Sequence, residues 1–248
     1  MSLPAFYLPP DAWASSVILT GPEASHARVL RLGAGEKIVL LDGKGREAIA
    51  VITKADKKGF DAAILEEHSW PMPRSRAIVA LALSKAVRRS FFLEKAAELG
   101  AWAIWLWQAE RSQGELTEKL LNSSANQIMA GAKQCHNPWF PSVSILADAR
   151  SLAEASRGAQ WRLLPWEEKA DMPPVSLQQL GREGETVYVI GPEGGLTNTE
   201  VSQFETVGFE TVSLGKRVLR CETAATLCLG LHWWASQLPG MPNQKTPV

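Results

Sequence analysis

Residues 187–201, VYVIGPEGGLTNTEV, combine an apolar run, a glycine-rich turn and the start of a helix. Residues 187–190 predict a buried strand, and Thr197-x-x-Glu200 is a capping box that predicts a helix from about Thr197. A strand, turn and helix in this order form a ligand cradle in open α/β sheets, often for a phosphate. This turn matches neither the ATP/GTP nor the dinucleotide fingerprint and carries no phosphate-binding lysine. The alternative is a tight βα turn without a ligand; if a ligand binds, Glu193 favours one with positive charge.

Residues 213–229, SLGKRVLRCETAATLCL, repeat this design with apolar residues, a turn at Gly215 and a helix start. Three basic residues crowd the short loop: Lys216, Arg217 and Arg220. Glu222 falls in the first helical turn, where the helix dipole favours a carboxylate. Solvated loop charges are the alternative interpretation, but a second ligand-type turn favours a binding site.

Other basic residues have the spacing of a nucleic-acid surface. They are Lys85, Arg88 and Arg89 on one expected helix, Arg111 after the next strand, and Arg28 and Arg31 near His26. The 248 residues carry 26 basic and 26 acidic side chains, so no global field draws the chain to RNA or to a membrane. A nucleic-acid site must therefore be a local patch, and a solvated helix face is the equally weighted alternative.

The cysteines indicate free thiols. Cys135, Cys221 and Cys228 are odd in number and include no CxxC pair, which is typical of a reducing compartment. Cys135-His136 lacks the partner ligands that a metal site needs, so we expect no metal. The N-terminus lacks a signal-peptide pattern and no apolar run is long enough to span a bilayer. We therefore expect a soluble, cytoplasmic protein without a membrane partner.

The pattern of expected secondary structure changes near residue 70. Before it, the short apolar runs 37–43, 47–56 and 59–67 alternate with turns and predict a small β-barrel or sandwich, and 69–76 reads as a linker. After it, strands are expected at 77–83, 102–107, 161–166, 186–190 and 210–214, and helices at 86–99, around 121–132, from 197 and around 224–238. Repeated βα units predict a parallel sheet with helices on both faces. Trp102, Trp105 and Trp107 then fit a core or dimer interface better than base stacking, and the tail 239–248 is expected to be disordered.

The two ligand-type loops also resemble a known family. GPEGG followed by Leu-Gly-x-Arg-x-Leu-Arg-x-Glu-Thr-Ala is similar to the C-terminal signature of RsmE-type enzymes. These are bacterial small-subunit (16S) ribosomal RNA uridine-N3 methyltransferases of the SPOUT superfamily. SHARVLRLGAGE (25–36) and LSKAVRRSFFLEKAAELG…ERS (83–112) resemble further family stretches, so the likeness covers most of the chain. The chain departs from the family at residues 133–137, KQCHN, where members usually carry Glu-Gln-x-x-Arg, and at Cys221, where they carry threonine.

The resemblance implies a PUA-like β-barrel RNA-binding domain over residues 1–72. It implies an α/β SPOUT methyltransferase domain with a C-terminal trefoil knot over residues 73–248. It further implies S-adenosyl-L-methionine as cofactor and a homodimer with active sites at the subunit interface. The implied partner is small-subunit ribosomal RNA within an assembled small subunit, which places the chain in rRNA processing and ribosome biogenesis.

The family also suggests roles for individual residues. The cofactor would lie bent between the loops at 164–166, 191–195 and 214–220. The implied cofactor-binding residues are Leu164, Pro165, Ile190, Gly191, Pro192, Glu193, Gly194, Gly195, Leu214, Gly215, Val218, Leu219, Arg220, Thr223 and Ala224. The expected RNA-binding residues are Arg28, Arg31, Lys85, Arg88, Arg111, Lys216 and Arg217.

Methyl transfer to uracil N3 needs a proton acceptor and stabilisation of the negative charge that develops on the base. Arg220 is the candidate for charge stabilisation and Glu222 for proton acceptance, with N-terminal helix electrostatics as the alternative role of Glu222. Two other functions stay open: a SPOUT ribose 2′-O RNA methyltransferase, and a non-catalytic RNA-binding ribosome-assembly factor.

Overall fold

The computed structural model describes residues 3–57 and 59–238, and the chain forms two compact units. The N-terminal unit comprises Met1–Met72 and Met129–Phe140, and the C-terminal unit comprises Pro73–Ile128 and Pro141–Val248. Residues 129–140 thus pack with the first unit, although the sequence pattern grouped them with the second. The tail 239–248, for which disorder was expected, lies outside the described residues.

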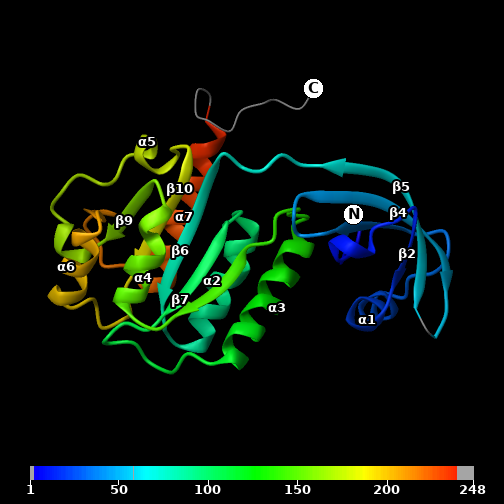
Figure 1. Cartoon of the computed structure of the whole chain (residues 1–248), viewed down its shortest axis with the longest axis horizontal. Helices are drawn as coiled ribbons and strands as arrows, with labels where there is room; N and C mark the ends of the chain where they lie inside the picture. The colour runs from blue at the N-terminus through cyan, green and yellow to red at the C-terminus, as the bar shows by residue number, and fades with distance from the viewer. Residues whose placement is uncertain (1–2, 58, 239–248) are drawn as a thin grey trace. The chain divides into compact units, whose positions relative to one another are not determined.

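The N-terminal unit is built on a five-stranded sheet in the order β1-β3-β4-β5-β2. Its strands are β1 (Ala5–Tyr7), β2 (Ser16–Leu19), β3 (Lys37–Leu41), β4 (Arg46–Ala55) and β5 (Phe60–Ser69). β1 and β3 run parallel, and the other neighbours run antiparallel. Two register irregularities between β4 and β5 allow these long strands to bend (Figure 1). The β-rich N-terminal domain expected from the sequence is present.

Helix α1 (Gly21–Val29) was not predicted within this β-rich region. Only Ala24 and Ala27 of the helix are buried, and both join the core formed by the sheet. Two small residues give no apolar stripe of helical period, so the sequence offered little signal for this helix. A short 3₁₀ helix, η1 (Pro10–Ala12), precedes β2.

The C-terminal unit is a parallel six-stranded sheet in the order β11-β9-β10-β6-β7-β8. The strands are β6 (Ser75–Ala82), β7 (Ala103–Trp107), β8 (Ser142–Leu146), β9 (Trp161–Pro165), β10 (Gly184–Ile190) and β11 (Glu210–Val212). The helices are α2 (Ala86–Glu98), α3 (Glu118–Gln134), α4 (Ala149–Ala155), α5 (Leu177–Leu180), α6 (Asn198–Thr206) and α7 (Cys221–Gln237), with 3₁₀ helices η2 (Ser156–Gly158) and η3 (Glu167–Lys169). From Met129 onward, α3 belongs to the N-terminal unit. The expected parallel sheet is confirmed; β8, α4 and α5 were not predicted.

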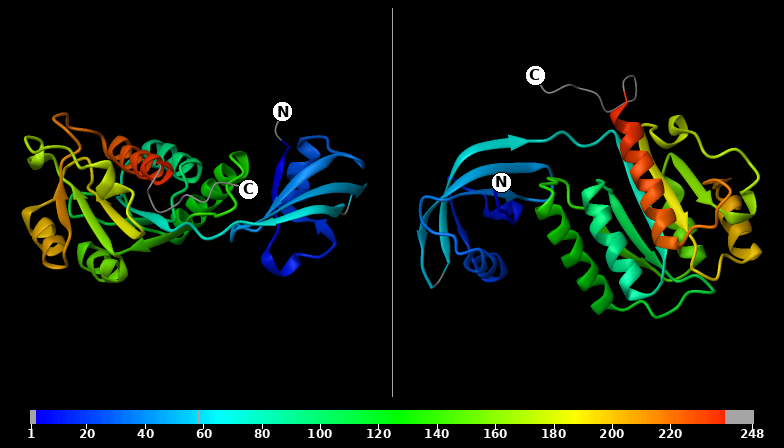
Figure 2. Two further views of the ribbon diagram at one scale, coloured as in Figure 1. Left: turned by 90° about the horizontal axis from the view of Figure 1, so that it is seen from above. Right: turned by 180° about the vertical axis from the view of Figure 1, so that it is seen from behind.

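Helices cover both faces of this sheet, as expected (Figures 1 and 2). Ile78 and Ala80 of β6 face a core that α4 and α6 complete, and Trp107 is fully buried there. The alternate residues of the central strands point to the opposite face, where α7 packs on β6, β10 and α2. None of the described helices is long and apolar enough to cross a membrane.

A buried polar chain fixes α7 to the centre of the sheet. His232 of α7 lies 3.0 Å from Ser75 Oγ of β6 through Nε2 and 2.9 Å from Tyr188 Oη of β10 through Nδ1. Burial lowers the pKa of His232 to about 4 and raises that of Tyr188 well above its ordinary value. A neutral imidazole can donate one hydrogen bond and accept one, so the uncharged ring satisfies both neighbours.

We expect the stability of the protein to depend on pH through His232. Its pKa is lower in the folded chain than in the unfolded chain, so the unfolded state binds the proton first as pH falls. The free energy of unfolding should therefore drop by up to about 3 kcal/mol between pH 6.5 and 4 from this group. In His232→Gln this component is absent, so the stability difference from wild type should shrink toward low pH in urea unfolding. Parallel pH profiles of the two proteins would contradict the assignment.

Candidate functional site

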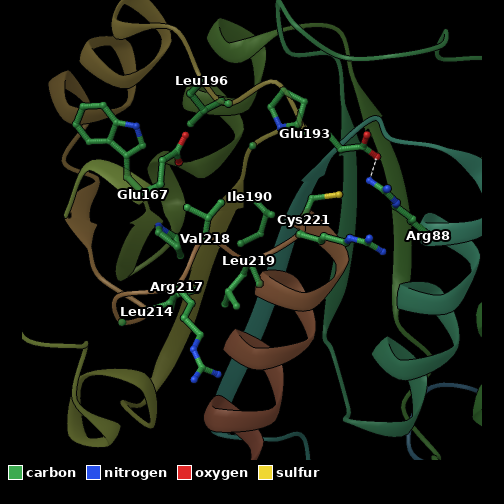
Figure 3. Close-up of a pocket in the computed structure, with 18 residues that line it drawn as sticks. Arg88, Glu167, Ile190, Glu193, Leu196, Leu214, Arg217, Val218, Leu219 and Cys221 are labelled. Atoms are coloured by element: carbon green, nitrogen blue, oxygen red, sulfur yellow. Dashed lines mark ion pairs between the residues drawn. The ribbon is translucent and has the colours of Figure 1, made fainter. Parts of the chain in front are cut away.

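A cavity of about 270 Å³ lies where the loops after β9, β10 and β11 meet the start of α7 (Figure 3). The carboxyl ends of parallel strands gather at one edge of a sheet, which is where open α/β sheets bind ligands. Twelve of the predicted cofactor-binding residues line the cavity: Pro165, Ile190, Gly191, Pro192, Glu193, Gly195, Leu214, Gly215, Val218, Leu219, Arg220 and Ala224. Leu164 is instead buried in the sheet, and Gly194 and Thr223 are not among the lining residues.

The cavity has six further lining residues that were not assigned to the cofactor. They are Arg88, Trp166, Glu167, Leu196, Arg217 and Cys221. Trp166 and Arg217 lie within the expected loops 164–166 and 214–220, although neither was assigned to the cofactor. Glu167, Leu196 and Cys221 each follow an expected loop directly, so widening each loop by one residue would have included them. Arg88 comes from α2, and no local pattern near the loops points to it.

The GPEGG turn is shaped by its glycines. Gly195 has a φ of 72°, a left-handed conformation that side chains disfavour, and its N–H donates to Pro192 O at 3.0 Å. A Cβ at Gly191 would lie 2.9 Å from Leu196 Cγ, so the turn packs directly against that side chain. The predicted capping box is present: Thr197 caps α6, with Glu200 bonded back to the Thr197 N–H.

Two contacts join this turn to the loop after β7. Glu200 is buried and its Oε1 accepts a hydrogen bond from Glu110 N at 2.9 Å. Arg111 Nη1 donates to Gly194 O at 3.0 Å. Arg111 was predicted to bind RNA; in the structure this exposed residue also supports the GPEGG turn.

Arg88 forms an electrostatic junction at the side of the cavity. Its Nη1 pairs with Glu193 Oε1 (Figure 3). Its Nε lies 3.7 Å from Glu222 Oε1. The side chains are 24% exposed for Arg88 and Glu193 and 12% for Glu222. Arg88 was expected on an RNA-facing surface, and Glu193 was expected to await a cationic ligand. In the structure the Glu193 carboxylate already has a cationic partner.

The two candidate catalytic residues differ in exposure. Arg220 is the exposed N-cap residue of α7 and lines the cavity. Glu222 lies two residues further on, in the first turn of α7; it is buried, and its Oε2 accepts a weak hydrogen bond from Cys221 Sγ at 3.4 Å. Burial raises the pKa of the Cys221 thiol, so this cysteine is not an activated nucleophile.

The third loop is held by both ends of the segment that follows β9. Val212 O accepts from Trp166 N at 3.1 Å, and Ser213 O accepts from Val175 N at 3.0 Å. The loop then turns at Gly215, whose φ is 105° and whose N–H donates to Ser213 Oγ. Both ends of residues 166–175 are therefore hydrogen-bonded to the end of β11.

The remaining predicted RNA-binding residues belong to both units. Lys85 and Lys216 are exposed in the C-terminal unit, and Arg217 lines the cavity. In the N-terminal unit, Arg31 is exposed, whereas Arg28 donates to Lys57 O at 2.9 Å and lies over the Phe60 ring.

The atypical segment 133–137 has contacts of its own within the N-terminal unit. Lys133 Nζ pairs with Glu23 Oε1 at 2.7 Å, and both side chains are largely buried. His136 Nε2 lies 3.0 Å from Leu3 O. Among the described residues, no three His, Cys, Asp or Glu side chains gather as a metal site.

Comparisons with known proteins agree with this geometry. Residues 71–233 match the family described as RNA methyltransferase domain, and residues 19–65 match RNA methyltransferase PUA domain. The chain is 33% identical over 231 residues to ribosomal RNA small subunit methyltransferase E of Mycobacterium bovis, covering 89% of this chain and 87% of that protein. It is 25% identical over 237 residues to the Bacillus subtilis protein of that name, covering 91% and 92%. Its fold matches ribosomal RNA small subunit methyltransferase E from Neisseria gonorrhoeae bound to S-adenosyl methionine, with a TM-score of 0.81, 30% identity and coverage of 92% and 95%.

Gly195→Ala should destabilise the protein. Alanine in a left-handed conformation costs about 1–2 kcal/mol, and the new Cβ would lie 2.8 Å from Glu167 Oε1. Gly158→Ala is the matched control, because that glycine has no positive φ and a Cβ there would meet nothing within 4 Å. Urea unfolding should show a loss only for Gly195→Ala; equal stabilities of the two variants would contradict the proposed strain.

Proposed function

The chain belongs to the RNA methyltransferase family, and from this premise we propose that it transfers a methyl group from S-adenosyl-L-methionine to N3 of a uridine in small-subunit (16S) ribosomal RNA. The observation that carries the proposal is the cavity itself. Both signature loops and the β9 loop, which are far apart in sequence, line one hollow at the carboxyl edge of the parallel sheet.

The lining chemistry fits this cofactor. The walls combine backbone groups of the glycine loops with apolar Ile190, Leu196, Val218 and Leu219, which suit a flat adenine ring. Glu167 and two arginines beyond the Arg88–Glu193 pair give charges of both signs, which suits a zwitterionic amino-acid group. When bound, the cofactor supplies a methyl group activated by a sulfonium.

We assign the protein's contribution to positioning and electrostatics. The Arg220 guanidinium at the cavity edge would stabilise negative charge on a uracil carbonyl oxygen as N3 loses its proton. Glu222 is the candidate acceptor of that proton, and Arg88 holds its carboxylate in place. Because Glu222 does not line the cavity, proton acceptance requires the base to reach past Cys221 or a water to relay the proton.

We propose that residues 1–72 recognise RNA and that residues 73–248 carry out methyl transfer. The N-terminal assignment is supported by the match to an RNA methyltransferase PUA domain. We also propose that the substrate is the RNA of an assembled small subunit, which places the protein in the cytoplasm.

Two architectural features complete the proposal. A trefoil knot, in which the segment after β11 threads the loop 166–175, is supported by the hydrogen bonds from both ends of that loop. A homodimer is supported by the exposed face of α7, where Trp233 and Trp234 are 43% and 53% exposed.

The proposed reaction is tested by incubating the protein with unmodified small subunits and labelled S-adenosyl-L-methionine. Mass spectrometry of the recovered RNA should find one 3-methyluridine. A 2′-O-methyl nucleoside would instead identify the ribose methyltransferase, and a protein that does not bind the cofactor in calorimetry would leave only the assembly role.

Arg220→Ala should lower kcat by about 100-fold or more at saturating cofactor and RNA, because a charge-stabilising donor is lost. Arg150→Ala removes an exposed arginine of α4 outside the cavity and should turn over like wild type. Unchanged turnover of Arg220→Ala would remove Arg220 from the mechanism.

A further inference from the structure

A second hollow of about 480 Å³ lies at the start of α2, within the C-terminal unit. Its polar lining includes Ser84, Lys85, Arg89, Gln113, Thr117 and Lys119. We call it the α2 groove. It adjoins the cofactor cavity through consecutive residues, since Arg88 lines the cavity and Arg89 lines the groove.

The α2 groove carries uncompensated positive charge. None of Lys85, Arg89 and Lys119 makes an ion pair with any described residue, and the one acidic lining residue, Glu115, is exposed. Arg89 is half-buried, and burial lowers the pKa of its guanidinium. Its Nη1 donates to Ser84 O at 2.9 Å, which leaves further donors of the planar fork for a ligand.

The end of α2 adds to this charge. The helix has no acidic residue in its first turn, and its N-cap Lys85 makes no side-chain capping bond, whereas α4 and α6 have complete capping boxes. The first amides of a helix have no partner within it and attract anions. Ser84, which is 3% exposed, also lines the groove, and its hydroxyl interacts with the thiol of Cys221, a residue that lines the cofactor cavity.

We propose that the α2 groove binds the phosphodiester backbone of the RNA strand whose uridine enters the cofactor cavity. The inference rests on the proposed function for the identity of the strand. The side chains of Lys85, Arg89 and Lys119 can donate hydrogen bonds to phosphate oxygens, and so can the first backbone amides of α2.

The test compares Arg89→Gln and Lys119→Gln with wild type in salt-dependent binding to unmodified small subunits, measured by co-sedimentation. Each variant should bind more weakly, and the slope of log K against log salt should flatten by about 0.7 for each lost contact. Arg89→Lys should retain most of the slope, and the affinity for S-adenosyl-L-methionine in calorimetry should stay unchanged in all three. Arg150→Gln is the matched control for removing an arginine.

Unchanged slopes in both groove variants, or an equal loss in Arg150→Gln, would overturn the proposal. Lys119 is exposed, so Lys119→Gln keeps the test decisive if the Arg89 variants unfold. Sedimentation measures RNA binding and requires no methyl transfer. A loss of binding through the α2 groove can therefore be distinguished from a loss of methylation.

Discussion

The cavity depends on one electrostatic junction, in which Arg88 lies between two carboxylates. Glu193 comes from the turn after β10 and Glu222 from the first turn of α7, while Arg88 comes from α2. Without the guanidinium, two carboxylates that are largely shielded from solvent would lose the cationic partner that they share. The junction therefore ties together three segments far apart in sequence, and it sets the position of two cavity walls.

The sequence predicted those elements whose signals are local. The capping box at Thr197, the apolar run of β10 and the helical spacing of α7 each depend on a few adjacent residues, and each lies where expected. Helix α1 was not predicted from the sequence because it buries only Ala24 and Ala27. Strand β8 was not predicted because it is an edge strand with no buried residue, so its apolar pattern is weak.

The site was predictable as far as its loops, because glycine-rich turns after strands carry their own signature. The roles of Arg88 and Arg111 were not predictable in this way. Both looked like surface charges, yet one pairs with Glu193 and the other donates to the carbonyl of Gly194. Such contacts depend on which faces of distant elements meet, and residue spacing along the chain contains no such information.

The hydrogen bonds from both ends of residues 166–175 to the end of β11 constrain the order in which the C-terminal unit can fold. Val212 and Ser213 can accept these two hydrogen bonds only after both ends of that segment have reached their native positions. The docking of α7 then closes the wall that carries Arg220 and Ala224. We therefore expect the ability to bind a ligand to arise late in folding, because contacts of such long sequence separation form slowly. A nascent chain would reach a compact sheet well before it could recognise a ligand.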